Sequence, residues 1–248
     1  MRKNNKNNTA VRSGKFVSVA AKDTPFAYAE AFKALRTNLG FLTNVSGVRS
    51  VLITSAVPEE SKSTTAINLA ITLASSGKSV VLVECDLRKP VLRKYLKREL
   101  GQSGLAAYLA GLVGLEDCIV ELKDLGICVI GAGVIPPNPS ELLNCDRMGG
   151  LIETLKLNFD YVLLDAPPVT LVTDAAVVGP KTDGALLVVR SKFASARTVR
   201  QAKTRLESVG VRILGGVLTR FDVRKSGWRG GYDYKTYEDG YGSGRSKR

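Results

Sequence analysis

One lysine and two hydroxyl residues follow an apolar run near residue 50, and their spacing suits phosphate binding. The run Val51–Ile53 has the composition of a buried strand, and Lys62, Ser63 and Thr64 begin a helical pattern. Backbone N–H groups of such a loop, and of the helix that follows, present positive dipole to phosphate oxygens. The lysine adds a full charge, and the next hydroxyl can bind Mg²⁺. The stretch therefore predicts a cradle for nucleotide phosphates.

The loop departs from the usual glycine-rich pattern. Ser61 replaces the glycine before the lysine, and Glu59 and Glu60 bring carboxylates to the place where phosphate should approach. An ordinary strand-to-helix turn with a solvated lysine is the alternative interpretation. The loop alone does not decide between the two, so the rest of the chain must.

Two further apolar runs end in acidic residues. Val80–Val83 is followed by Glu84 and Asp86, and Tyr161–Leu164 is followed by Asp165. In open α/β sheets, ligands bind at the carboxyl ends of the strands. Carboxylates placed there beside a phosphate loop are suited to hold Mg²⁺. The three strand ends together predict a nucleotide and magnesium site at one edge of a sheet.

Strands and helices alternate along the chain between these points. We expect strands at 51–53, 79–83, 127–130, 161–164, 185–189 and 213–218. We expect helices at 26–43, 62–76, 90–97, 173–178 and 195–209, short helices within 103–124, a helix capped by Ser140 and a second running to about 157. Continuous apolar strands that alternate with helices predict an α/β fold of the P-loop NTPase type, with a mostly parallel sheet covered on both faces.

Composition sets further limits. The chain has 248 residues and 44% hydrophobic residues, which is typical of a globular protein with one large domain or two small ones. It has no histidine, which excludes His-based triads and most zinc chemistry. Its four cysteines lack C-x-x-C spacing, its first residues lack a signal-peptide core, and no apolar run could span a membrane. We therefore expect a cytoplasmic protein.

Basic charge is concentrated at the two ends of the chain. The net charge is +13, of which residues 1–24 carry +5 and residues 220–248 carry +4. We expect a flexible basic segment over 1–24, one domain over 25–220 and a flexible tail over 221–248. Basic ends suit contact with anionic lipid, nucleic acid or an acidic protein, although solubilising tails explain them equally well.

The tail is unusually rich in tyrosine. Half of the eight tyrosines lie within residues 232–241, among glycines and acidic residues: Tyr232, Tyr234, Tyr237 and Tyr241. Segments of this kind are normally poor in aromatic residues, and no core-facing period explains these. The cluster is a candidate phosphoacceptor, and an aromatic interaction tail is the alternative.

Taken together, these features resemble the bacterial tyrosine autokinases of capsule and exopolysaccharide production. The resemblance runs from about Glu30 to the C-terminus. The stretches that carry it are Glu30–Leu39 (usually E-x-x-R-x-x-R), Thr54–Thr65 (Walker A), Glu84–Pro90 (usually D-x-D-x-R), Pro136–Leu143, Asp165–Pro168 (Walker B) and the tyrosine tail. Five positions depart from the family pattern: Lys33 for arginine, Glu59 and Ser61 for glycines, Glu84 for aspartate, and Thr219 where a base-contacting asparagine often stands.

The resemblance implies ATP as phosphoryl donor, Mg²⁺ as cofactor and tyrosine as acceptor. It assigns the nucleotide contacts to Pro58, Glu59, Glu60, Ser61, Lys62, Ser63, Thr64, Arg88 and Thr219. It gives Ser63, Asp86 and Asp165 as magnesium ligands, and Lys62, Glu84, Asp86 and Asp165 as the catalytic group. Glu84 is our candidate for the base that accepts the tyrosine proton.

The resemblance also implies partners. Subunits would form a ring, an octamer in the family, through Glu30, Lys33 and Arg36, and tails would be phosphorylated in trans. A membrane-spanning polysaccharide co-polymerase would activate the kinase at the inner face of the plasma membrane, and a tyrosine phosphatase would reverse the reaction. Nucleic acid is not expected. A partitioning or positioning ATPase, and an ATP-binding adaptor of polysaccharide export without catalysis, are the alternatives.

Overall fold

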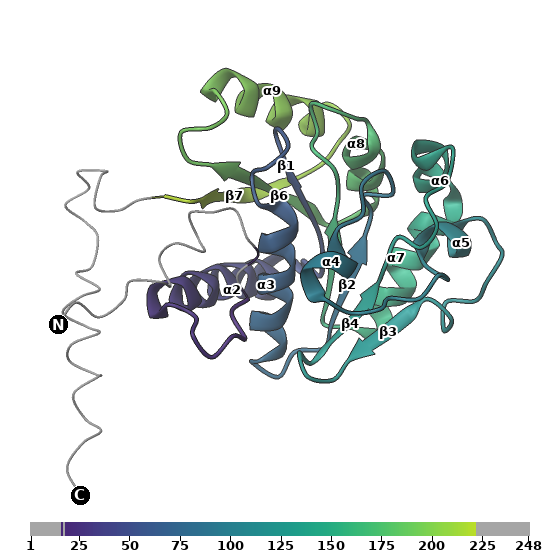
Figure 1. The fold of residues 1–248 in the computed structure, drawn as a ribbon. Helices are drawn as coiled ribbons and strands as arrows, with labels where there is room; N and C mark the ends of the chain where they lie inside the picture. The colour runs from purple at the N-terminus through teal and green to yellow at the C-terminus, as the bar shows by residue number, and fades with distance from the viewer. Residues whose placement is uncertain (1–15, 17, 222–248) are drawn as a thin grey trace, which may run out of the picture.

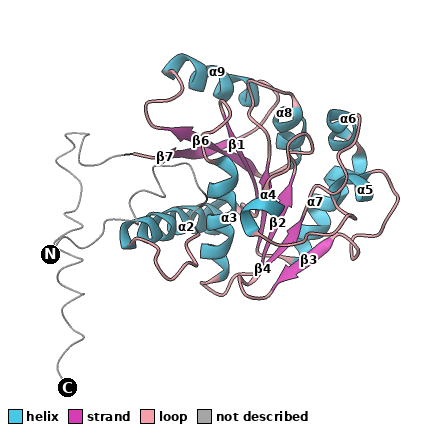
Figure 2. Ribbon diagram, viewed as in Figure 1, coloured by secondary structure: helices cyan, strands magenta, loops and turns pink. Residues whose placement is uncertain are grey.

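A seven-stranded sheet organises the chain (Figures 1 and 2). The structure is a computed structural model, and it describes residue 16 and residues 18–221. The strand order is β3-β4-β2-β5-β1-β6-β7, and every pairing is parallel except that of β3 with β4. The strands are β1 (Ser50–Ser55), β2 (Val80–Glu84), β3 (Ile119–Leu122), β4 (Ile127–Ile130), β5 (Tyr161–Asp165), β6 (Gly184–Arg190) and β7 (Ile213–Thr219). The predicted fold class is confirmed.

Helices cover both faces of this sheet. They are α2 (Phe26–Ser46), α3 (Lys62–Ala74), α4 (Leu92–Leu96), α5 (Leu105–Leu109), α6 (Pro139–Asn144), α7 (Asp146–Asn158), α8 (Asp174–Val178), the 3₁₀ turn η1 (Gly179–Lys181) and α9 (Ala196–Glu207). Apolar residues of α2, α3 and α4 pack on one face, and those of α5 to α9 pack on the other (Figure 1).

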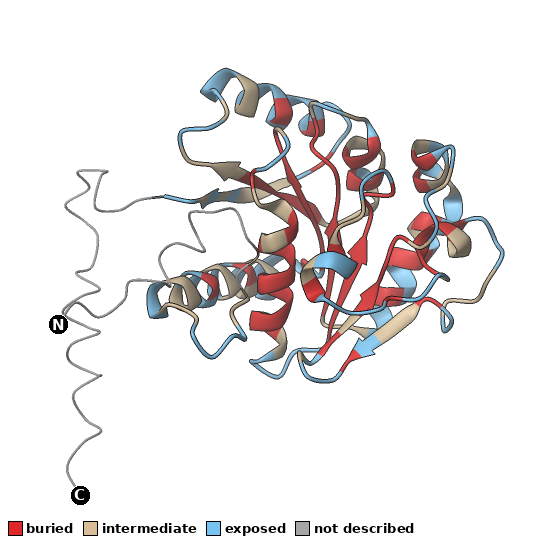
Figure 3. Ribbon diagram, in the orientation of Figure 1, coloured by how far each residue is buried: buried red, intermediate tan, exposed pale blue. Residues whose placement is uncertain are grey.

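The central strands are buried on both faces (Figure 3). In β1, Val51 and Ile53 pack toward α3, whereas Leu52 belongs to the opposite cluster. This alternation follows from the two-residue period of a strand, and it explains why the run is apolar without interruption. The double burial fixes the carboxyl ends of β1, β2 and β5, from which the functional side chains project.

Three local predictions were incomplete. Residues 103–124 contain α5 but also β3, an edge strand whose four residues are too few to show a period. Helix α4 begins at Leu92 rather than at the predicted Pro90. Helix α6 begins at Pro139, and the Ser140 hydroxyl bonds to another element instead of capping it.

The described part of the N-terminal segment contacts the domain. The Phe16 ring stacks on Tyr95 with centroids 5.5 Å apart, and the Val19 N–H donates to the Asn68 side chain at 2.8 Å. Contacts with the domain therefore begin before the predicted boundary at residue 24. Within residues 16 and 18–221, no helix is both long and apolar enough to cross a bilayer.

Candidate active site

The loop between β1 and α3 uses left-handed backbone where glycine was expected. Glu59 and Ser61 have φ values of 65° and 72°. Non-glycine residues in this region cost about 1–2 kcal/mol each, because Cβ crowds the following carbonyl. The usual glycines of the motif therefore correspond to a real backbone requirement, which this chain meets with strained residues.

Glu60 holds the loop from inside. Its side chain is fully buried, and its two carboxylate oxygens accept the N–H groups of Val57 at 3.0 Å and of Arg190 at 3.1 Å. Its carbonyl accepts the Thr219 hydroxyl at 3.0 Å. The Glu60 carboxylate is therefore engaged within the protein, and the concern that it would repel phosphate applies only to the exposed Glu59.

The expected catalytic cluster converges at the first turn of α3. The Lys62 ammonium lies 3.1 Å from an Asp86 oxygen, 3.3 Å from an Asp165 oxygen and 3.3 Å from the Ser63 hydroxyl. Burial lowers the pKa of Lys62, but the two carboxylates outweigh burial and hold that pKa above its ordinary value. Lys62 therefore stays protonated at the junction of β1, β2 and β5.

The donor set fits a magnesium ion. The Asp165 side chain is fully buried, and among the described residues its second oxygen has no hydrogen-bond partner. An unpaired buried carboxylate oxygen is costly unless a cation or water completes it. Asp165, Asp86 and the Ser63 hydroxyl offer the hard oxygen ligands that Mg²⁺ prefers. These residues could hold the ion beside nucleotide phosphates.

Glu84 lies at the end of β2, as expected, and its carboxylate is bonded to backbone groups. Its carboxylate accepts the N–H groups of Val91 at 2.5 Å, Leu92 at 2.7 Å and Ala132 at 3.2 Å. Burial raises the pKa of Glu84, and these bonds partly oppose that rise. Its contacts explain why α4 starts at Leu92, since they satisfy the first N–H groups of that helix. They do not favour the general-base role, which stays a prediction.

Arg88 bonds to residues of α6 and α8 rather than to the Lys62 cluster. Its guanidinium makes two bonds to the Asp174 carboxylate, at 2.9 and 3.2 Å, and one to the Ser140 hydroxyl at 2.7 Å. Ser140 also donates to Asp174 at 2.6 Å. Asp174 is fully buried, and the sequence analysis missed it. Its only sequence signal was an acid at the start of a short predicted helix.

The remaining predicted residues are less closely associated with the cluster. Pro58 is exposed, and Thr64 is half-buried in the first turn of α3. On α2, Lys33 pairs with Glu30 at 2.7 Å, whereas Arg36 donates to the Thr72 carbonyl of α3 at 3.2 Å. The four acceptor tyrosines lie outside the described residues.

The fold and the Lys62 site define a P-loop nucleotide-binding domain. The family model described as "CobQ/CobB/MinD/ParA nucleotide binding domain" matches residues 51–231. The tyrosine-protein kinase YwqD of Bacillus subtilis is 34% identical over 206 residues, covering 83% of this chain and 86% of the relative. The tyrosine-protein kinase etk of Escherichia coli is 38% identical over 213 residues, covering 86% of this chain and 29% of the relative.

The solved kinase domain of Escherichia coli tyrosine kinase ETK superposes with a TM-score of 0.80. It is 36% identical, and the match covers 88% of this chain and 86% of that one. The chain therefore belongs to the bacterial tyrosine-protein kinase family. The resemblance drawn from the sequence motifs is confirmed.

Proposed function

We propose that the chain transfers the γ-phosphoryl group of Mg-ATP to the tyrosines at its own C-terminus, in another copy of the chain. The observation that carries this proposal is the convergence of Lys62, Asp86 and Asp165 at three strand ends. The family relationship supports the reaction class. Tyr232, Tyr234, Tyr237 and Tyr241 remain the predicted acceptors.

The charges of Lys62, Asp86 and Asp165 give these residues different roles in the reaction. Lys62 would neutralise the β- and γ-phosphate oxygens. Its ammonium can exchange the carboxylates for these oxygens, because the oxygens are anionic too. Asp165 and Ser63 would hold the magnesium ion directly, and Asp86 would hold it through water. The bound ion would neutralise charge that develops on the transferring phosphoryl group. Glu60 keeps the loop amides in place, since it ties the loop to β6 and β7.

A base must accept the hydroxyl proton of the acceptor tyrosine. A tyrosine hydroxyl has a pKa of about 10 and is protonated at neutral pH. Transfer forms a bond from the tyrosine oxygen to the γ-phosphorus, breaks the bond from that phosphorus to the β–γ bridging oxygen, and releases ADP and one proton. Among the three acids, Asp86 has a side chain that is 9% exposed and accepts one backbone N–H, from Lys89, whereas Asp165 is fully buried and Glu84 accepts three backbone N–H groups. We therefore propose Asp86 as the proton acceptor, with Glu84, the candidate from the sequence, as the alternative.

The proposed cellular setting follows the family. The chain would form a ring, an octamer in the family, through the α2 face that carries Glu30 and Lys33. It would work at the inner face of the plasma membrane with a membrane-spanning co-polymerase, and a tyrosine phosphatase would reset it. Phosphorylation adds about −1.5 to −2 charge per tyrosine, so repeated transfer would repel the tail from an anionic site and open the ring. The output would be control of capsular or exopolysaccharide polymerisation and export.

Phosphotyrosine detection with purified chain tests the proposal. Wild-type protein should label with Mg-ATP and lose the label with EDTA, and Lys62→Met should stay unlabelled while unfolding at a similar temperature. Mixing Lys62→Met protein with protein cut after residue 221 should restore label on the Lys62→Met tails. ATP hydrolysis without phosphotyrosine would instead support a partitioning-type ATPase, and ATP binding with neither activity would support the adaptor.

A further inference from the structure

A pocket of about 710 Å³ opens at the carboxyl edge of β2 and β4, next to α4. We call it the α4 pocket, and its walls are Glu84, Pro90, Arg93, Lys94 and residues 97–102 and 131–135. Glu84 is the inner wall, and it pairs in strand register with Asp165. Asp86 lies two residues further along the same chain segment. The α4 pocket is thus the neighbour of the Lys62 cluster on the β2 side.

The rim of the α4 pocket is basic. Arg93 is paired with Glu99 at 2.6 Å, and Arg98 is paired with Asp124. Lys94 and Lys97 are exposed, and within the described part of the chain neither makes an ion pair with a carboxylate. These two lysines therefore give the pocket an unbalanced positive charge beside the site of phosphoryl transfer.

One wall of the pocket is apolar and exposed. Val134 and Ile135 are 68% and 57% exposed, although both are large aliphatic residues. The backbone just before them is fixed, because the Gly131 carbonyl accepts the Leu105 N–H at 2.8 Å and a Cβ at Gly104 would lie 2.4 Å from the Gly133 nitrogen. A rigid aliphatic surface beside Lys94 and Lys97 suits a ligand that combines an aromatic ring with negative charge.

We propose that the α4 pocket binds the acidic tyrosine segment of the acceptor chain, residues 232–241 of another copy. This segment places Asp233, Glu238 and Asp239 beside its tyrosines and holds one basic residue, Lys235, so its net charge is −2. An acceptor ring packs on Val134 and Ile135, and the neighbouring acids pair with Lys94 and Lys97. The inference rests on the proposed function for the identity of the segment. It adds a recognition site that selects tyrosines flanked by acids.

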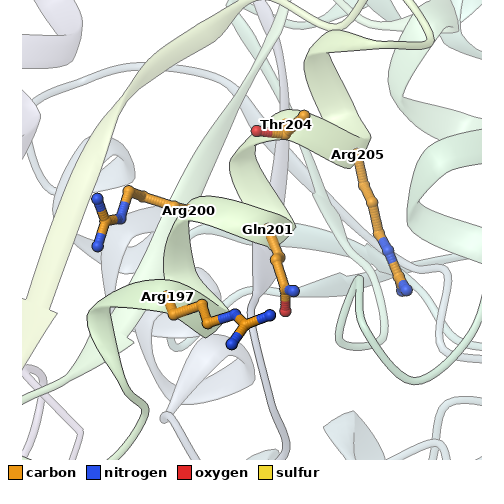
Figure 4. A pocket seen from close by; sticks show the side chains of 5 residues that line it. All are labelled: Arg197, Arg200, Gln201, Thr204 and Arg205. Carbon is orange, nitrogen blue, oxygen red and sulfur yellow. The ribbon is translucent and has the colours of Figure 1, made fainter.

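A second basic surface provides a control. Arg197, Arg200 and Arg205 line a shallow hollow on α9 (Figure 4). Helix α9 packs in the half of the sheet that contains β7, away from β2 and β4. Arg205 already donates to the Val169 and Thr170 carbonyls at 3.3 and 3.2 Å. The α9 hollow is lined by polar side chains alone, so it lacks the aliphatic wall of the α4 pocket.

Peptide binding to inactive protein separates this inference from the proposed function. Fluorescence polarisation measures a labelled peptide of residues 231–242 on full-length Lys62→Met chain in 50 mM salt. Lys94→Glu plus Lys97→Glu should raise Kd for the peptide by about tenfold, because two exposed charges that attract its acids become charges that repel them. A second peptide carries Asp233→Asn, Glu238→Gln and Asp239→Asn, so its one remaining charged side chain is Lys235. For this peptide the lysine changes should not raise Kd, whereas Ile135→Ser should still raise it.

The matched control is Arg197→Glu plus Arg200→Glu, which reverses the same number of charges and should leave Kd unchanged. An unaltered Kd in the lysine variant overturns the inference, and so does a larger loss in the α9 control, because the segment would then dock on α9. In chain with active Lys62, the lysine variant should raise KM for the peptide and leave KM for ATP unchanged. Absence of any peptide phosphorylation, with binding as described, would count against the proposed function and leave the pocket assignment standing.

Discussion

The Thr219 hydroxyl, at the end of β7, donates a 3.0 Å hydrogen bond to the carbonyl of Glu60 in the phosphate loop. The Glu60 carboxylate adds a bond to the Arg190 N–H, at the end of β6. The loop is therefore tied to two strands on the side of the sheet opposite to β2. Thr219 stays a predicted nucleotide contact, and its hydroxyl also positions the predicted phosphate loop.

Removing this hydroxyl should loosen the loop. Thr219→Val should lower the free energy of unfolding by about 1 kcal/mol, the usual net value of one hydrogen bond, and weaken Mg-ADP binding. Thr219→Ser keeps the hydroxyl and should retain most of both. Urea unfolding and calorimetric titration with Mg-ADP measure the two effects. If valine and serine variants behave alike, the bond does not position the loop.

Glycine at the strained loop positions should stabilise the protein. Ser61→Gly should raise the free energy of unfolding by about 0.5–1 kcal/mol, because relief of left-handed strain exceeds the entropy that glycine adds to the unfolded chain. Gln201→Gly in the exposed middle of α9 should lower it by about 0.5–1 kcal/mol. Thermal unfolding of both variants measures these opposite changes in stability. Destabilisation by both would show that Ser61 contributes contacts that outweigh its strain.

The extent to which the sequence predicted this site depended on distance along the chain. Prediction of Lys62, Asp86 and Asp165 required only the apolar runs that precede them and the rule that parallel strands end at one edge, and these three residues do meet. The partners of Arg88 and Glu60 could not be predicted in this way. Asp174 lies 86 positions from Arg88, and Arg190 lies 130 positions from Glu60. Such contacts depend on how helices pack after the sheet forms, which periodicity does not encode.

The bond between Arg88 and Asp174 should be specific to a guanidinium. Arg88→Lys keeps the charge but cannot make two parallel bonds, so it should cost about 1 kcal/mol of unfolding free energy. Asp174→Asn keeps one buried acceptor oxygen but replaces the other with an N–H₂ donor that faces Arg88 or Ser140, and it should cost about 1–3 kcal/mol. Urea unfolding measures both. Ser140→Ala in the Asp174→Asn background should add less than it does alone, and full additivity would contradict a shared cluster.

Assembly should depend on exposed charges of α2. Arg36 bonds to Thr72 of its own chain, whereas Glu30 and Lys33 form an exposed pair that a neighbouring subunit could exchange for contacts across the ring. Glu30→Ala plus Lys33→Ala should therefore reduce the assembled fraction, and wild-type assembly should weaken between 50 and 500 mM salt, since exposed charge interactions are screened. Light scattering reports both. Lys203→Ala on α9 is the control, and an assembly unaffected by the α2 changes would refute this interface.

Glu84→Gln distinguishes a structural carboxylate from a catalytic base. Burial raises the folded-state pKa of Glu84 above its unfolded value of about 4.3. The folded state therefore favours the protonated form, so this group's contribution to stability is greatest below the unfolded pKa and is lost as pH rises through the folded pKa. Glutamine cannot titrate, so stability measured against wild type should shift in favour of the variant as pH rises from 4 to 7.

Autophosphorylation of the Glu84→Gln variant is measured beside its stability. Burial raises the pKa of Asp165 as well, and the Asp165 charge adds to the rise at Glu84, so the difference between the two unfolding curves reports on this coupled pair. The Glu84→Gln variant should keep measurable autophosphorylation, since its side-chain oxygen can still accept the Val91 and Leu92 N–H groups. Asp86→Asn should abolish the label at every pH. A variant at Glu84 that is folded, binds Mg-ADP and yet fails to label would restore Glu84 as the base.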